Sequence, residues 1–343
     1  MNIQQALEAI TQGRDLSRAE TQDVFQLIMT GEATPSQIGA FLAAIRVKGE
    51  TPEEIAGAAT VMRALSTRVE VSCEHLVDTC GTGGSGTKLF NISTAAAFAA
   101  AAAGARVAKH GNRKMTSFCG SADVLEAAGV NLNLSPAQIA TCIEEVGVGF
   151  MFAQAHHSAM RFAGPVRQEI GIRTMMNILG PMTNPAGARR QVIGVFGIEW
   201  QHRMAEVLNL LGAEHAMIVH SEGLDEIRLD APTEVVELKD GRIESYTLRP
   251  EDVGLTLQDR SVLNELTADS TESSLALVRQ SLTEPDCLAA EIVTLNAGAA
   301  IYVAGIATSL KNGVVMAQDA VASGLAKERL DELVRISRLM GEA

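Results

Sequence analysis

The chain has 343 residues, of which 47% are hydrophobic and 20% are charged, and its formal net charge is −13. This composition is typical of a packed protein of about two domains and excludes a disordered chain. No block rich in lysine and arginine offsets the negative charge, which argues against a nucleic-acid partner. An anion must therefore be bound locally, by N–H groups, a few cations or a metal ion.

The amino terminus lacks the basic region and apolar run of a signal peptide. The longest apolar run, residues 95–105, is too short and too rich in alanine to span a bilayer. The five cysteines are odd in number and include no C-x-x-C pair. We therefore expect a cytoplasmic protein with free thiols and no membrane partner.

Residues 1–70 predict helices only. Ser17 and Glu20 form a capping box, and the Thr34-Pro35 and Thr51-Pro52 pairs open further helices. We expect a helical bundle domain over residues 1–72, with a role in packing or oligomerisation. Residues 157–190 predict helices broken by Gly-Pro and Asn-Pro pairs, and the segment 165–188 is expected to complete this bundle.

The remaining segments, 73–164 and 189–343, are expected to form a second domain. Its pattern alternates strands with helices, and the expected strands are LVDTC, ARVAKHG, GVGFMF, QVIGVFG and HAMIVHS. Residues 234–248 differ, because two apolar runs flank a D-G turn and predict an antiparallel hairpin. The fold class expected is α/β: a helical bundle domain and a larger doubly wound, mostly parallel domain.

A glycine-rich loop follows the first expected strand and precedes a helix. Its spacing, Gly81-x-Gly83-x-x-Gly86, fits a dinucleotide-binding fingerprint. The next strand, however, ends in the cationic KHGNR rather than in the acid that an NAD ribose needs, so only NADP stays as a weak alternative. The loop also departs from the Walker motif, which needs a lysine directly after the last glycine, because Thr87 separates Gly86 from Lys88.

The same loop predicts a site for a large anion. Asn91, Ser93 and Thr94 are expected to cap the helix that follows, whose free N–H groups and dipole favour a phosphate. A second polar loop, residues 111–123, also leads into a helix, and two such loops at neighbouring strand ends suit a ligand with two phosphate groups. Asp225 and Glu226 follow another strand and suit Mg²⁺.

Three segments, DTCGTGGSGTKLFNIST, KHGNRKMTSFCGSADVLEAAGV and GLDEI, resemble the anthranilate phosphoribosyltransferase family in order and spacing. The resemblance covers essentially the whole chain, including ILGPMTNP. It implies the nucleoside phosphorylase/phosphoribosyltransferase type of fold, a homodimer formed through the N-terminal helices, and Mg²⁺ as cofactor. It also implies transfer of the phosphoribosyl group of phosphoribosyl pyrophosphate (PRPP) to the amine of anthranilate, in tryptophan biosynthesis.

The resemblance further implies roles for single residues. Those implied to bind PRPP are Gly81, Gly84, Ser85, Leu89, Asn91, Ile92, Ser93, Thr94, Lys109, His110, Gly111, Asn112, Arg113, Lys114, Met115, Thr116, Ser117 and Ser121. Those implied to hold anthranilate or line its path are Gly81, His110, Asn112, His157, Arg167 and Pro181. Those implied to serve Mg²⁺ are Ser93, Asp225 and Glu226.

The chain departs from the family pattern at Ser85, where aspartate is common, and at Leu89, where threonine is frequent. The reaction needs little early proton transfer, so we expect catalysis by positioning and charge stabilisation, with no single general acid or base. Two alternatives remain. One is an enzyme like pyrimidine nucleoside phosphorylase, which would want no paired acids, and the other is a non-catalytic nucleic-acid-binding paralogue, which the negative charge opposes.

Overall fold

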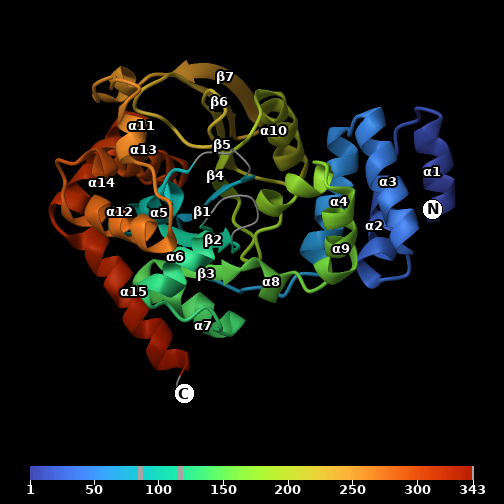
Figure 1. The fold of residues 1–343 in the computed structure, drawn as a ribbon, viewed down its shortest axis with the longest axis horizontal. Helices are drawn as coiled ribbons and strands as arrows, with labels where there is room; N and C mark the ends of the chain where they lie inside the picture. The colour runs from blue at the N-terminus through green and yellow to red at the C-terminus, as the bar shows by residue number, and fades with distance from the viewer. Residues whose placement is uncertain (84–87, 114–118, 342–343) are drawn as a thin grey trace.

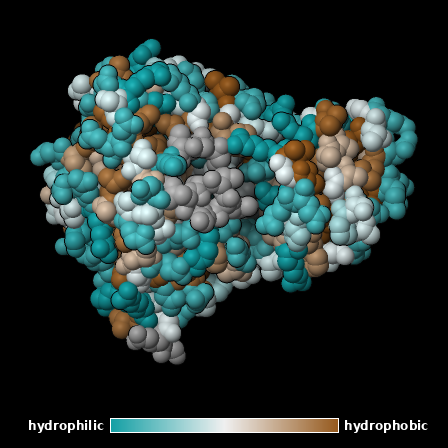
Figure 2. Space-filling view, in the orientation of Figure 1, coloured by the Kyte–Doolittle hydropathy of each residue, from teal (hydrophilic) through white to brown (hydrophobic). Residues whose placement is uncertain are grey.

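The computed structural model describes residues 1–83, 88–113 and 119–341. These residues form a smaller lobe made of helices and a larger lobe built around a seven-stranded sheet (Figure 1). In the space-filling view the smaller lobe projects from one side of the larger one (Figure 2). The expected combination of a helical bundle with a larger α/β domain is confirmed.

Among the described residues, five helices make up the smaller lobe. They are α1 (Ile3–Thr11), α2 (Arg18–Thr30), α3 (Pro35–Lys48), α4 (Pro52–Ala64) and α9 (Met160–Ile170). Each of the first four begins with a capping box, in which a polar side chain accepts a hydrogen bond from the first turn. Helix α9 packs against α2 and α3 although it lies far along the chain (Figure 1).

The sheet has the order β3-β2-β1-β4-β5-β6-β7. Its strands are β1 (Leu76–Gly81), β2 (Arg106–Gly111), β3 (Val148–Phe152), β4 (Arg190–Gly194), β5 (His215–His220), β6 (Thr233–Lys239) and β7 (Arg242–Leu248). The first five strands in chain order pair in parallel, and β6 and β7 add an antiparallel hairpin at one edge. The order reverses between β1 and β4, and open sheets bind ligands at such a switch point.

Helices cover both faces of the sheet. The remaining ones are α5 (Ile92–Ala102), α6 (Ser121–Ala128), α7 (Pro136–Thr141), α8 (Ala153–His156), α10 (Gln201–Leu210), α11 (Val262–Glu265), α12 (Thr271–Thr283), α13 (Leu288–Val303), α14 (Leu310–Ala322) and α15 (Leu325–Gly341). A π-helical turn, Cys142–Val146, continues α7. Short 3₁₀ turns span Met175–Asn177, Gly180–Met182, Ile198–Trp200 and Pro250–Val253. Helices α5 and α13 pack on one face, and α10 packs on the other and contacts α4.

Two large hydrophobic clusters follow from this layering. One joins α5 and the carboxy-terminal helices to one face of the sheet. The other runs from the bundle through residues 175–182 to α10 and the opposite face, so the two lobes share a continuous core. Within the described residues no single helix is long and apolar enough to cross a membrane, and only the bent pair α12–α13 reaches that length and composition jointly.

Candidate functional site

Two glycines at the carboxyl ends of adjacent central strands allow an acidic loop to pass close to these strand ends. Gly81 ends β1, Gly194 ends β4, and the two are partners in the parallel register. A Cβ atom on Gly194 would lie 1.7 Å from the backbone oxygen of Asp225, and one on Gly81 would lie 2.9 Å from Asp225 Oδ2. The loop after β5 therefore rests directly on the carboxyl ends of β1 and β4.

Asn296 of α13 anchors this loop just beyond the acid pair. Its Oδ1 accepts a hydrogen bond from Ile227 N at 3.0 Å, and its Nδ2 donates to Ile227 O at 2.9 Å. Asn296 is not among the site residues predicted from the sequence. The available signal was a lone amide side chain within the apolar helix LAAEIVTLNAGAAIYV, because a buried amide needs partners.

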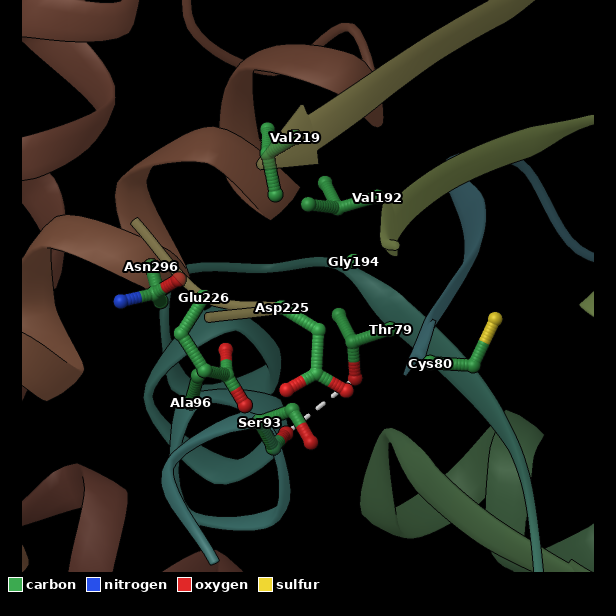
Figure 3. Close-up of a pocket in the computed structure, with 10 residues that line it drawn as sticks. All are labelled: Thr79, Cys80, Ser93, Ala96, Val192, Gly194, Val219, Asp225, Glu226 and Asn296. Carbon is green, nitrogen blue, oxygen red and sulfur yellow. Dashed lines mark hydrogen bonds between the residues drawn. The ribbon is translucent and has the colours of Figure 1, made fainter. Parts of the chain in front are cut away.

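A small pocket lies between the acid pair and the start of α5 (Figure 3). It is lined by Thr79, Cys80, Ser93, Ala96, Val192, Gly194, Val219, Asp225, Glu226 and Asn296. The carboxylates of Asp225 and Glu226 lie near Ser93, and the Thr79 hydroxyl donates to Ser93 O at 3.2 Å (Figure 3). The pocket has a volume of about 10 Å³, which leaves room for one water-sized group beside these oxygens.

The acid pair concentrates negative charge in a half-buried place. Desolvation and then the nearby charge of Asp225 raise the pKa of Glu226 to about 8, although Lys109 and the backbone N–H of Ser93 oppose the shift. A buried hydroxyl, Thr94 Oγ1, has no hydrogen-bond partner among the described residues. Two carboxylates beside hydroxyl oxygens are the hard donors that Mg²⁺ prefers, so these residues fit that ion.

Lys109 brings the end of β2 to the same place. Its buried Nζ donates to Thr79 O at 2.6 Å and lies 3.4 Å from Ser93 Oγ. Desolvation lowers its pKa, while the charges of Asp78 and Glu226 act in the opposite direction. The structure thus brings together the cationic strand end and the helix start that the sequence singled out.

The side chain of Asn91 does not cap α5, so that expectation is wrong. Asn91 is the N-cap residue but makes no capping hydrogen bond, because its Oδ1 accepts from Ser274 Oγ at 2.7 Å instead. The side chain of Ile92 is fully buried in the core, so only its backbone can face a ligand. Leu89 is half-buried and forms an isolated β-bridge with Thr267.

The second polar loop is described only at its two ends. The guanidinium of Arg113 pairs with Asp123 at 3.2 Å and with Glu126 at 2.6 Å, so its charge is already shared with α6. Ser121, at the start of α6, lies 3.5 Å from the backbone oxygen of Asn112. Six predicted ligands lie outside the described residues: Gly84, Ser85, Lys114, Met115, Thr116 and Ser117.

Two buried histidines lie side by side. The rings of His110 and His157 have centroids 5.1 Å apart. Desolvation, followed by the proximity of other histidines, lowers the pKa of His110 to about 3 and that of His157 to about 4. Both rings are therefore neutral near pH 7. Pro181, also buried, accepts a hydrogen bond from the side chain of Gln191 at 2.7 Å.

Arg167 is a half-buried cation on α9. Among the residues that the structure describes, its guanidinium makes no hydrogen bond or ion pair, and burial lowers its pKa. A partly buried charge without a protein partner is costly, which indicates a place for an anionic ligand.

Known proteins match this chain over nearly its whole length. The helical bundle domain of the glycosyl transferase family matches residues 4–66, and the a/b domain of that family matches residues 73–327. An anthranilate phosphoribosyltransferase from Teredinibacter turnerae is 56% identical over 344 residues, which cover 99% of this chain and 100% of the relative. One from Ectopseudomonas mendocina is 55% identical over 342 residues, covering 98% and 97%.

Solved structures agree. The crystal structure of anthranilate phosphoribosyltransferase from Thermus thermophilus has a TM-score of 0.91 at 44% identity and covers 97% of this chain and 99% of that one. An anthranilate phosphoribosyltransferase from Saccharomyces cerevisiae, in complex with PRPP and Mg, has a TM-score of 0.88 at 22% identity and covers 98% of each chain. At that identity the second likeness concerns the fold alone.

Proposed function

The chain belongs to the anthranilate phosphoribosyltransferase family, and on that premise we propose that the site at the ends of β1 and β4 transfers the phosphoribosyl group of PRPP to the amine of anthranilate. The products are N-(5-phosphoribosyl)anthranilate and pyrophosphate, in tryptophan biosynthesis. The observation that carries this proposal is the acid pair held over Gly81 and Gly194, beside the start of α5.

Asp225, Glu226 and Ser93 are the residues that would hold Mg²⁺. The ion would neutralise charge on the pyrophosphate group as it leaves. The raised pKa of Glu226 supports this assignment, because two neighbouring carboxylates at a partly buried site stay ionised most readily with a cation between them.

The donor substrate would bind where three kinds of positive potential meet. The start of α5 offers free N–H groups and its dipole, and the buried ammonium of Lys109 lies 3.4 Å from Ser93 Oγ. Asn91, Thr94 and the remaining PRPP residues inferred from the sequence belong to this site in our proposal. Their task is to position PRPP and to stabilise charge, without a general acid or base.

The acceptor would bind against Arg167. Its planar guanidinium can take the anthranilate carboxylate through two parallel hydrogen bonds. His110, His157 and Pro181 would line the entry path, and the two neutral histidine rings offer surfaces suited to an aromatic ligand. Asn112 and Gly81 complete the acceptor site in this proposal.

We also propose the arrangement of the whole protein. Residues 1–72 together with 165–188 would form one domain, and residues 73–164 and 189–343 the other. The chain would act in the cytoplasm as a homodimer formed through its N-terminal helices. Light scattering in solution tests the dimer.

Two parallel assays, one with each set of substrates, test the function. The protein is mixed with PRPP, Mg²⁺ and anthranilate, and the loss of anthranilate fluorescence is followed. A parallel reaction supplies thymidine and phosphate. We expect anthranilate to be consumed and thymidine to persist. Phosphorolysis of thymidine without anthranilate turnover would instead assign the chain to the nucleoside phosphorylases.

A further inference from the structure

Asn91 is held from a distant helix. Ser274 Oγ donates to Asn91 Oδ1 at 2.7 Å and accepts from Asn91 N at 3.2 Å. Because the backbone N–H of Asn91 fixes the hydroxyl as an acceptor, the single hydroxyl proton is directed to Oδ1. The hydroxyl group of Ser274 thus both donates to Asn91 and accepts from it.

These bonds determine which end of the Asn91 amide is available. With Oδ1 engaged by Ser274, the Nδ2 group is left as the end that can meet a ligand, and its one contact to a described residue is a long 3.5 Å bond to Cys119 O. An amide nitrogen carries two N–H donors. Asn91 is only half-buried, so it presents a donor at the start of α5.

The support behind Asn91 is rigid. Ser274 is fully buried on α12, which packs against α5 and α6. The segment just before α12 also holds the residues that precede Asn91, because Phe90 N donates to Leu266 O at 3.0 Å and Ala268 N donates to Lys88 O at 2.7 Å. Together, residues 266–274 hold the start of α5, and α12 lies beside α5 (Figure 1).

We propose that Ser274 is a positioning residue for the donor substrate: it orients Asn91 so that the amide nitrogen faces PRPP. The inference rests on the proposed function, since it assigns a PRPP contact to Asn91. It goes beyond that function by giving α12, which contributes none of the proposed substrate ligands, a part in PRPP binding.

A matched pair of variants separates positioning from packing. Ser281 is also fully buried on α12, but its hydroxyl donates to Val278 O within the same helix at 2.8 Å. Ser274→Ala and Ser281→Ala therefore each delete one buried hydroxyl. We expect Ser274→Ala to raise the KM for PRPP by about three- to tenfold, the value of one hydrogen bond, and to leave the KM for anthranilate within about twofold. Ser281→Ala should leave both constants unchanged.

A double-mutant cycle tests whether the effect passes through Asn91. In an Asn91→Ala background, Ser274→Ala should change the KM for PRPP by less than about twofold. The proposal is overturned if Ser274→Ala and Ser281→Ala have the same effect on that KM, or if the effects of Ser274→Ala and Asn91→Ala are fully additive.

A binding measurement keeps this test independent of turnover. Isothermal titration calorimetry of PRPP with Mg²⁺ should show the same ranking of the variants. A protein that binds PRPP with this ranking but leaves anthranilate unconsumed would refute the proposed function and retain the role of Ser274. Unchanged PRPP affinity in Ser274→Ala, beside a lowered thermal unfolding temperature, would refute the positioning role.

Discussion

In the proposed function, Arg167 is the side chain that would hold the carboxylate of the acceptor. Its guanidinium is half-buried, and it makes no ion pair to a described residue. Arg167→Ala should raise the KM for anthranilate far more than the KM for PRPP, by an interaction of about 2–4 kcal/mol. Steady-state kinetics with each substrate varied in turn measure the two effects. Arg161→Ala, an exposed arginine of the same helix, is the control, and equal effects of Arg167→Ala on both substrates would place Arg167 elsewhere.

The two buried histidines predict a pH dependence of stability. Their folded pKa values, about 3 for His110 and about 4 for His157, lie below the ordinary value of 6.5. As pH falls below about 6.5, the unfolded chain takes up protons that the folded chain refuses. Stability is therefore complete above that pH and is lost as pH falls toward 4, by up to about 1.4 kcal/mol per pH unit for each histidine.

Denaturant unfolding at pH 7.5 and at pH 5 measures this loss. The variant His157→Gln should lose less stability between the two pH values than the unchanged protein, because one of the buried rings with a lowered pKa is gone. An identical loss in both proteins would show that His157 titrates normally when folded.

At the scale of elements, the acidic loop depends on a strand end without a side chain. A Cβ on Gly194 would meet the backbone of Asp225 at 1.7 Å, so Gly194→Ala must displace the loop. A displacement of about 1 Å at a catalytic site can cost on the order of a hundredfold in rate, and we expect that loss with the circular dichroism spectrum retained. Gly39→Ala is the control, since its Cβ would meet nothing closer than 3.6 Å. Equal activity of the two variants would separate the loop from catalysis.

Elements whose signals are local could be predicted from the sequence. The capping residues of α2, α3 and α4, the parallel strands and the D-G turn of the β6–β7 hairpin all follow from neighbouring residues. The contacts that shape the site could not be predicted from the sequence, because their partners are distant along the chain. Ser274 lies 183 positions from Asn91, and Asn296 lies 69 positions from Ile227. Local rules therefore favour Asn91 as a helix cap, whereas in the fold its side chain accepts a hydrogen bond from Ser274.

At the scale of the whole molecule, Arg63 of α4 ties the helical bundle to the larger lobe through Leu211. Its Nε donates to Met182 O at 2.7 Å and its Nη1 to Leu211 O at 3.4 Å, and desolvation lowers its pKa to about 10. Arg63→Ala should lower the free energy of unfolding by about 1–3 kcal/mol, because the carbonyl groups of Met182 and Leu211 lose their donor. Chemical denaturation measures it, with exposed Arg46→Ala as the control. Equal stability of both variants would exclude this tie.

We propose that Asp225 and Glu226, resting on β1 and β4, serve the Mg²⁺ of a phosphoribosyl transfer to anthranilate. The most direct test of this claim is the initial rate of anthranilate fluorescence loss, titrated with Mg²⁺ at saturating PRPP, for the unchanged protein and for the isosteric double variant Asp225→Asn, Glu226→Gln. The unchanged protein should show a rate that rises with Mg²⁺ to saturation, and the variant should lose on the order of a thousandfold in rate while keeping its circular dichroism spectrum. Superimposable Mg²⁺ curves for the two proteins would contradict the claim.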